Sequence, residues 1–208
     1  MQEIISYPQL TKQYQDVSTF LFDMDGTVMN TEVIHARAIN QIIHEQVGIE
    51  LELSKLELMC IGLTDEVVYE KLISDKLVKD LDLTSFLSRK KELFTEILVD
   101  IDPSEIFNEK VRSLLENISQ NKNLALVTSS EKDTTIQLLE FLNIKHLFRL
   151  IITREDTSLN KPHPEPYLHA MKELQVESNA CLIFEDSVPG RTAALNSGAK
   201  LFEVSWYA

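Results

Sequence analysis

Short, continuous apolar runs recur along the chain, and each is followed by polar or turn-forming residues. The runs cover residues 19–22, 124–127, 150–152 and 181–184. Uninterrupted runs of this length are typical of strands that are buried on both faces of a parallel sheet. Helical patterns over residues 131–142 and 165–174 lie between them, so the chain alternates strand and helix. This rhythm predicts an α/β fold with a Rossmann-like, doubly wound parallel sheet.

The region from residue 31 to residue 100 carries helical patterns and no strand pattern. Apolar side chains recur at helical spacing from Val33 to Val47, and Gly48 marks a helix end. Capping signals predict the starts of three further helices. These signals are Ser54 with Glu57, then Thr64, then Thr84 or Ser85. We therefore predict a discontinuous α/β core, residues 1–30 and 101–208, with an all-helical insert over residues 31–100.

Composition narrows the possible partners. The formal net charge is -13, and 44% of the residues are hydrophobic while 25% are charged. These are the proportions of an ordinary soluble globular protein. So acidic a chain is not expected to bind nucleic acid, which needs a basic face, or an anionic membrane surface. A small phosphorylated molecule stays possible if the site supplies its own local cation.

The expected compartment is the cytoplasm. No stretch is long and apolar enough to cross a bilayer, and the first sixteen residues lack the basic start and apolar run of a secretory signal. Cys60 and Cys181 lie far apart without a paired metal-binding spacing. We interpret both as buried thiols in a reducing compartment.

The first strand ends in Asp23-Met24-Asp25-Gly26-Thr27. Ligands of open parallel sheets bind at the carboxyl ends of the strands, so two acids at this position can share one site. Gly26 allows the chain to turn away sharply. An Asp-x-Asp pair alone is more often an acidic turn before a helix. The Gly-Thr that follows, directly after a buried strand, favours a catalytic role.

Three later segments also place reactive side chains at or near strand ends. They are Thr128-Ser129-Ser130, Lys161-Pro162-His163-Pro164 and Glu185-Asp186-Ser187. Each has an ordinary explanation when taken alone: a helix cap, a solvated loop lysine, and a second helix cap. Together with the first strand end they supply a nucleophile, a proton donor, hydroxyls, a lysine and acids that suit a hard cation. This combination favours chemistry on a phosphate.

These four segments resemble the motifs of the haloacid dehalogenase superfamily, and specifically of its branch with a helical cap inserted after the first motif. The similarity extends from Phe20 to about Val204. Within the superfamily the sequence is most similar to the beta-phosphoglucomutase-like and phosphoglycolate-phosphatase-like group. The resemblance implies an enzyme, a phosphoric monoester hydrolase acting on a small phosphorylated metabolite. It also implies that the protein is a monomer.

The resemblance assigns the catalytic and phosphate-binding residues. Asp23 is expected to attack phosphorus and form an aspartyl-phosphate. Asp25 is expected to protonate the leaving alcohol and then to activate the attacking water. The phosphoryl oxygens are expected to be bound by Thr128, by the Ser129 backbone and by Lys161.

The resemblance also implies Mg²⁺ as the cofactor. Its expected ligands are Asp23, the main-chain carbonyl of Asp25, and Asp186, with Glu185 beside them as a partner of the ligands. A transferring phosphoryl group needs positioning and charge neutralisation above all, which a metal ion and Lys161 would supply.

Two other functions remain open at this point. A beta-phosphoglucomutase-type phosphomutase needs a grip on a second phosphate, and Asp65 stands where the resemblance to the mutase suggests an arginine. An anion at that position speaks against a bisphosphate intermediate. A non-catalytic signalling module that is phosphorylated on aspartate uses similar residues, but it has no helical insert of this size.

Overall fold

The computed structural model describes residues 2–60 and 64–207, except for the side chain of Cys60. The chain divides into two compact units. One consists of Met1–Asn30 and Phe107–Ala208, and the other of Thr31–Ile106. We describe the first as the α/β unit and the second as the helical unit.

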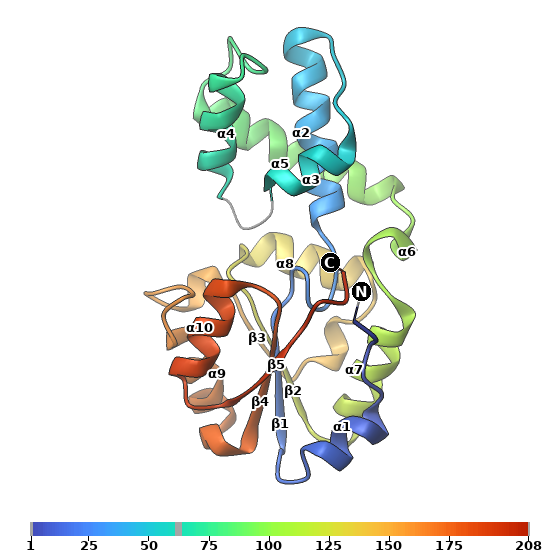
Figure 1. Ribbon diagram of the computed structural model, residues 1–208, viewed down its shortest axis with the longest axis vertical. Coiled ribbons are helices and arrows are strands. Elements are labelled where there is room, and N and C mark those ends of the chain that lie inside the picture. Colours follow the sequence, from blue (N-terminus) through green and yellow to red (C-terminus); the bar gives the residue numbers. More distant parts are fainter. Residues whose placement is uncertain (1, 61–63, 208) are drawn as a thin grey trace. The chain divides into compact units, whose positions relative to one another are not determined.

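The α/β unit is built on a five-stranded parallel sheet in the order β3-β2-β1-β4-β5 (Figure 1). The strands are β1 (Thr19–Phe22), β2 (Asn123–Val127), β3 (Leu150–Ile152), β4 (Cys181–Glu185) and β5 (Lys200–Glu203). The central strand β1 pairs with β2 on one side and β4 on the other, so that Phe22 lies opposite both Leu126 and Phe184. The predicted α/β fold with a parallel sheet is confirmed.

Helices cover both faces of this sheet (Figure 1). They are α1 (Tyr7–Gln13), α7 (Glu109–Asn121), α8 (Lys132–Phe141), α9 (Glu165–Leu174) and α10 (Val188–Asn196). Three short 3-10 turns, η1 (Lys145–Leu147), η2 (Arg154–Asp156) and η3 (Ser178–Ala180), complete the unit. Tyr167 of α9 and Ala193 of α10 pack on Leu21 of β1 in one buried cluster. Burial of such clusters is the main favourable term in the stability of the unit.

The helical unit contains α2 (Glu32–Val47), α3 (Leu53–Cys60), α4 (Asp65–Ser74), α5 (Leu83–Asp100) and α6 (Pro103–Ile106). Its core is a cluster of apolar side chains from α2 to α5, with Ile39, Leu72 and Phe86 fully buried. Helix α2 ends at Gly48, which has the left-handed φ of 72° that favours glycine.

Two of the predicted helix starts are wrong. Ser54 lies inside α3, and its hydroxyl donates to the Glu52 carboxylate at 2.9 Å and caps no helix. Helix α5 begins after Asp82, whose carboxylate accepts from the Ser85 backbone N–H at 2.8 Å. Asp82 is therefore the N-cap residue, in place of the expected Thr84 or Ser85. Its carboxylate belongs to the residue three positions before Ser85 and can accept the hydrogen bond of the Ser85 N–H. Thr64 precedes α4 as expected.

The helical unit contains a lysine and a histidine whose polar groups are buried. The side chain of Lys90 is 6% exposed and forms an ion pair with Asp65, whose side chain is 43% exposed. The Nδ1 atom of His35 is buried and has no hydrogen-bond partner among the described residues, and the ring lies 5.0 Å from that of Phe94. Burial, and then the positive charge of Lys90, lower the pKa of His35 to about 3.

No helix in residues 2–60 or 64–207 has both the length and the apolar character that a membrane crossing requires. Cys181 is a buried free thiol, as expected, while the Cys60 side chain lies outside the described residues.

Candidate active site

Asp23 stands directly after β1 and is 8% exposed. Its backbone N–H donates to the Phe184 carbonyl at 3.0 Å, which extends the sheet ladder and fixes the direction of the side chain. The chain then turns at Gly26, where φ is 80°. A Cβ atom on Gly26 would lie 2.3 Å from Oδ2 of Asp186. Glycine is therefore required here both for its backbone conformation and for the approach of Asp186.

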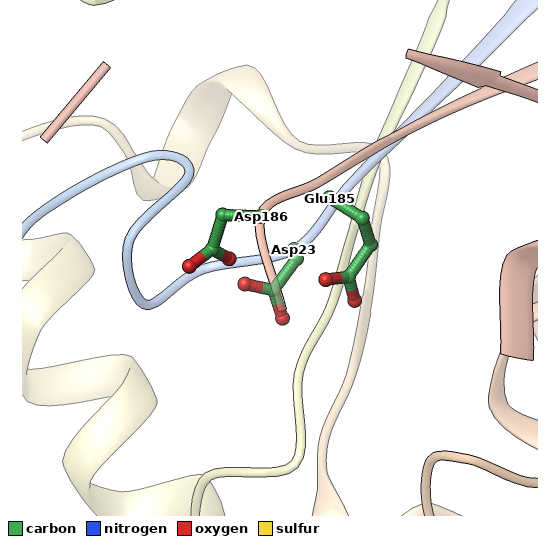
Figure 2. Close-up of side chains that lie close together, drawn as sticks. All are labelled: Asp23, Glu185 and Asp186. Atoms are coloured by element: carbon green, nitrogen blue, oxygen red, sulfur yellow. The ribbon is translucent and has the colours of Figure 1, made fainter. Parts of the chain in front are cut away.

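Three carboxylates converge at the carboxyl ends of β1 and β4. Asp23, Glu185 and Asp186 each offer an oxygen, and these atoms lie within 4.8 Å of one another. Figure 2 shows the three carboxylates turned toward one common space. They come together because β1 and β4 are parallel neighbours whose carboxyl ends meet at the same edge of the sheet.

Asp186 is held by two residues to which the sequence assigned no such role. The Thr27 hydroxyl donates to Oδ1 of Asp186 at 3.2 Å, and Thr27 is fully buried. The guanidinium of Arg191 donates to the main-chain carbonyl of Asp186 at 2.9 Å. The acid is therefore fixed at its side chain and at its backbone.

Lys161 reaches the same place from the loop before α9. Its side chain is 5% exposed, and Nζ donates to Oδ1 of Asp23 at 2.6 Å, to Oε1 of Glu185 at 2.6 Å and to the Val127 carbonyl at 2.8 Å. An ammonium group has three N–H donors, so all three are used. The expected lysine is thus beside the expected nucleophile, and its segment folds as a turn with a cis Lys161–Pro162 bond.

Asp25 and the residues after β2 complete this edge of the sheet. The Ser130 hydroxyl donates to Oδ2 of Asp25 at 2.7 Å, so the strand ends of β1 and β2 are linked through these side chains. Thr128 is 2% exposed, and its Oγ1 accepts from the Ser130 backbone N–H at 3.0 Å. Ser129 is exposed between them. The structure therefore brings Asp23, Asp25 and Lys161 to one edge, with Thr128 at the end of the adjoining strand.

The site holds more negative than positive charge. Burial first, and then repulsion by Glu185, raise the pKa of Asp23 well above its ordinary value, although Lys161 acts in the opposite direction. The same two causes raise the pKa of Asp186 to about 6. Burial opposes the charged form of Lys161, but Asp23 and Glu185 outweigh it and raise the pKa of the ammonium group. Buried carboxylates with raised pKa values are characteristic of functional sites.

This donor set fits a magnesium ion. Mg²⁺ prefers oxygen ligands and is usually held by one or two carboxylates. A divalent cation near Asp23 and Asp186 would also relieve the repulsion that raises their pKa values. Glu185 is less suited to bind it, because both of its carboxylate oxygens already accept hydrogen bonds from protein groups.

The family of this chain follows from its sequence as well as from this site. The family model of the haloacid dehalogenase-like hydrolases matches residues 20–204. The chain therefore belongs to the haloacid dehalogenase-like hydrolases, and the resemblance seen in its motifs is confirmed.

Individual relatives are phosphatases and a mutase. The chain is 29% identical over 183 residues to the phosphorylated carbohydrates phosphatase of Thermotoga maritima, covering 86% of this chain and 80% of the relative. It is 24% identical over 194 residues to the fructose-1-phosphate phosphatase of Escherichia coli, covering 92% and 98%. Among solved structures, the beta-phosphoglucomutase of Clostridium difficile is similar with a TM-score of 0.69 and 25% identity, covering 92% and 86%.

Three contacts of the site were not predicted from the sequence: those of Ser130 with Asp25, of Arg191 with Asp186, and of Tyr167 with Glu185. Tyr167 is fully buried, and its hydroxyl donates to Oε1 of Glu185 at 2.6 Å. A tyrosine on the otherwise apolar inner face of the helix after Lys161 was the available signal, because a buried hydroxyl needs a partner.

Proposed function

We propose that this protein is a magnesium-dependent phosphatase that hydrolyses a small phosphorylated metabolite, such as a sugar phosphate, through an aspartyl-phosphate on Asp23. One observation carries the proposal. The ammonium group of Lys161 lies 2.6 Å from Asp23 at the end of a central strand, among the carboxylates of Glu185 and Asp186. A nucleophile held between a cation and metal-binding acids suits attack on a phosphoryl group, because the transferring group must be positioned and its charge neutralised.

In the first step, Asp23 attacks phosphorus, and the bond between phosphorus and the leaving oxygen breaks. Asp25 donates a proton to that oxygen, so the alcohol leaves in neutral form. Ser130 orients Asp25 through the 2.7 Å hydrogen bond. Lys161 and Thr128 donate hydrogen bonds to the phosphoryl oxygens.

In the second step, water attacks the phosphorus of the aspartyl-phosphate, and Asp25 takes a proton from it. Phosphate leaves and the Asp23 carboxylate is restored, so the cycle closes with one water consumed and no other reactant. Asp25 acts first as acid and then as base, as the two half-reactions require.

Magnesium, bound by Asp23, the main-chain carbonyl of Asp25, and Asp186, would neutralise charge on the phosphoryl oxygens and help to orient them. Thr27 and Arg191 keep Asp186 in place for this role. Glu185 supports Lys161 instead of the metal.

A phosphomutase is the second candidate, and the helical unit argues against it. Asp65 forms an ion pair with Lys90, so this buried cation is already neutralised within the unit. A bisphosphate intermediate would need an unpaired positive group to hold its second phosphate. We therefore assign the phosphoryl acceptor as water. The net charge of -13 supports a diffusible small substrate over a nucleic acid or an anionic membrane, and we propose a cytoplasmic monomer.

The test is turnover of a panel of phosphate monoesters, including both glucose phosphates, with magnesium and with a chelator. We expect release of free phosphate only with magnesium, and a loss of at least about a thousandfold in Asp23→Asn. Thermal unfolding of the variant checks that it folds. Interconversion of the glucose phosphates without free phosphate would establish a mutase, and a long-lived phosphoprotein without turnover would indicate a signalling module.

A further inference from the structure

Tyr167 carries a polar group into the core of the α/β unit. Its side chain is fully buried on α9, within the cluster that includes Leu21 and Ile183. The phenol hydroxyl donates to Oε1 of Glu185 at 2.6 Å. Burial, and then the charge of Glu185, raise the pKa of Tyr167 well above its ordinary value, so this hydroxyl stays a donor. Phenylalanine would fill the same volume without the hydrogen bond.

Glu185 is confined on every side that the structure describes. Its Oε1 accepts from Tyr167 and from Lys161, each at 2.6 Å. Its Oε2 accepts from the hydroxyl of Ser187 at 3.1 Å and from the Ser187 backbone N–H at 3.3 Å. A Cβ atom on Gly190 would lie 1.9 Å from Oε1, so the helix backbone closes the remaining side. A carboxylate with about four acceptor positions is thus fully engaged.

Lys161 depends on this arrangement for its position. Nζ lies 5.0 Å from the centre of the Tyr167 ring, within the range of a cation–π interaction. Its three donors go to Asp23, Glu185 and the Val127 carbonyl. When a phosphoryl oxygen accepts from Lys161, one of these three bonds must be given up. Asp23 is the partner that changes during the reaction, so Glu185 and Val127 remain to hold the ammonium group.

We infer that Tyr167 is a positioning residue for phosphate binding. Its hydroxyl fixes Glu185, and Glu185 together with the Tyr167 ring fixes Lys161 against the nucleophile. This role deepens the proposed function and rests on it. The acidic cluster then has two parts: Asp23 and Asp186 bind the metal, while Glu185 positions Lys161.

The test compares Tyr167→Phe with a matched control, Tyr69→Phe. The Tyr69 hydroxyl also donates one hydrogen bond, to the Leu81 carbonyl at 2.9 Å, but within the helical unit. We expect Tyr167→Phe to bind orthophosphate, in the presence of magnesium, about tenfold more weakly, because a hydrogen bond to a charged group is lost. Magnesium binding without phosphate should stay within about twofold, since Asp23 and Asp186 are unchanged. In turnover, KM should rise by more than kcat falls.

A double-mutant cycle tests whether Tyr167 acts through Glu185. If it does, Tyr167→Phe should add less than about twofold to the loss of phosphate affinity already caused by Glu185→Gln. Should Glu185→Gln fail to fold, Ser187→Ala takes its place, because it removes another donor to the same carboxylate. Calorimetric titration measures all of these affinities, and thermal unfolding measures the stability of each variant.

The inference is overturned if Tyr167→Phe binds phosphate within twofold of the wild type while losing as much stability as Tyr69→Phe. The hydroxyl would then serve the packing of the core alone. Failure of the wild type to bind orthophosphate with magnesium would also overturn it. A wild type that binds phosphate but hydrolyses no ester would refute the proposed function, and a tenfold effect of Tyr167→Phe on binding would still support the role of Tyr167.

Discussion

Each unit of this protein buries a lysine, but the two lysines are compensated in different ways. Lys161 in the α/β unit contacts two buried acids and a carbonyl, all within 2.8 Å. Lys90 in the helical unit is paired with Asp65, a carboxylate that is 43% exposed. Burying a charge is costly unless it is fully paired. The α/β unit therefore compensates its lysine with three protein partners, whereas Lys90 pairs with one partly exposed carboxylate among the described residues of the helical unit.

The two units should differ most in their effect on kcat/KM when the buried lysine of each is replaced. Lys161→Met is expected to lower kcat/KM by about 10² to 10³, the usual loss when a charged donor to a developing anion is removed. Lys90→Met should lower it by less than about tenfold, because the Asp65 carboxylate left behind is partly hydrated. Steady-state kinetics on one phosphate ester measure both.

Equal losses in the two lysine variants would contradict the comparison. They would mean that the helical unit contributes a charge to catalysis as important as that of Lys161. Magnesium titration of both variants provides the control, since neither lysine is assigned to the metal.

A second matched pair compares two glycines with positive φ. Gly26→Ala places a Cβ atom 2.3 Å from the Asp186 carboxylate, whereas a Cβ atom on Gly48 would have no atom of the described residues within 4 Å. Both substitutions carry backbone strain of about 1 kcal/mol. Gly26→Ala should in addition weaken magnesium binding by about tenfold or more, because it displaces a predicted ligand.

Calorimetric magnesium titrations, with thermal unfolding alongside, separate these two effects. The glycine comparison fails if Gly26→Ala loses stability and keeps its magnesium affinity. That result would remove Asp186 from the proposed ligands.

A third prediction concerns the pH dependence of the stability of the helical unit, with no effect on the proposed site. The pKa of His35 is lowered from 6.5 to about 3 by burial and by Lys90. Between these values the unfolded chain binds a proton that the folded chain does not, so the free energy of unfolding falls as pH decreases through this window. For this group the loss is about 2 kcal/mol between pH 7 and pH 5.

Denaturant unfolding at pH 7 and pH 5 measures how much the free energy of unfolding falls between these two pH values. His35→Gln should reduce the difference between the two pH values, while His146→Gln, at an exposed position of the α/β unit, should leave it unchanged. An unchanged difference in His35→Gln would show that other groups cause the acid sensitivity.

The strands and the positions of the main site residues could be predicted from sequence because both depend on local patterns. Continuous apolar runs predicted β1 to β4, and the parallel arrangement then required Asp23 and Asp186 to meet at one edge. Helix α1 was not predicted. Leu10 is the buried side chain that this helix contributes to the core, and one buried position produces almost no helical periodicity in the sequence.

Side-chain partners could not be predicted in the same way. Ser130 and Asp25 are 105 residues apart in the chain, and Tyr167 reaches Glu185 across the interface of helix and sheet. Such bonds depend on how elements pack, which residue spacing does not encode. The start of α5 was missed for a simpler reason: the pattern pointed to Thr84 or Ser85, while Asp82, a good capping residue, was overlooked.

The strand order also has a consequence for how the protein folds. Thr19 of the central strand pairs with Asn123 and with Cys181, both far along the chain, and the whole helical unit lies between Thr19 and the first of these partners. Contacts between distant residues form slowly, whereas a helical unit closed by local contacts forms fast. During synthesis the helical unit should therefore fold first, and Asp23, the proposed nucleophile, should stand in no formed site until β4 has been made and has joined the sheet.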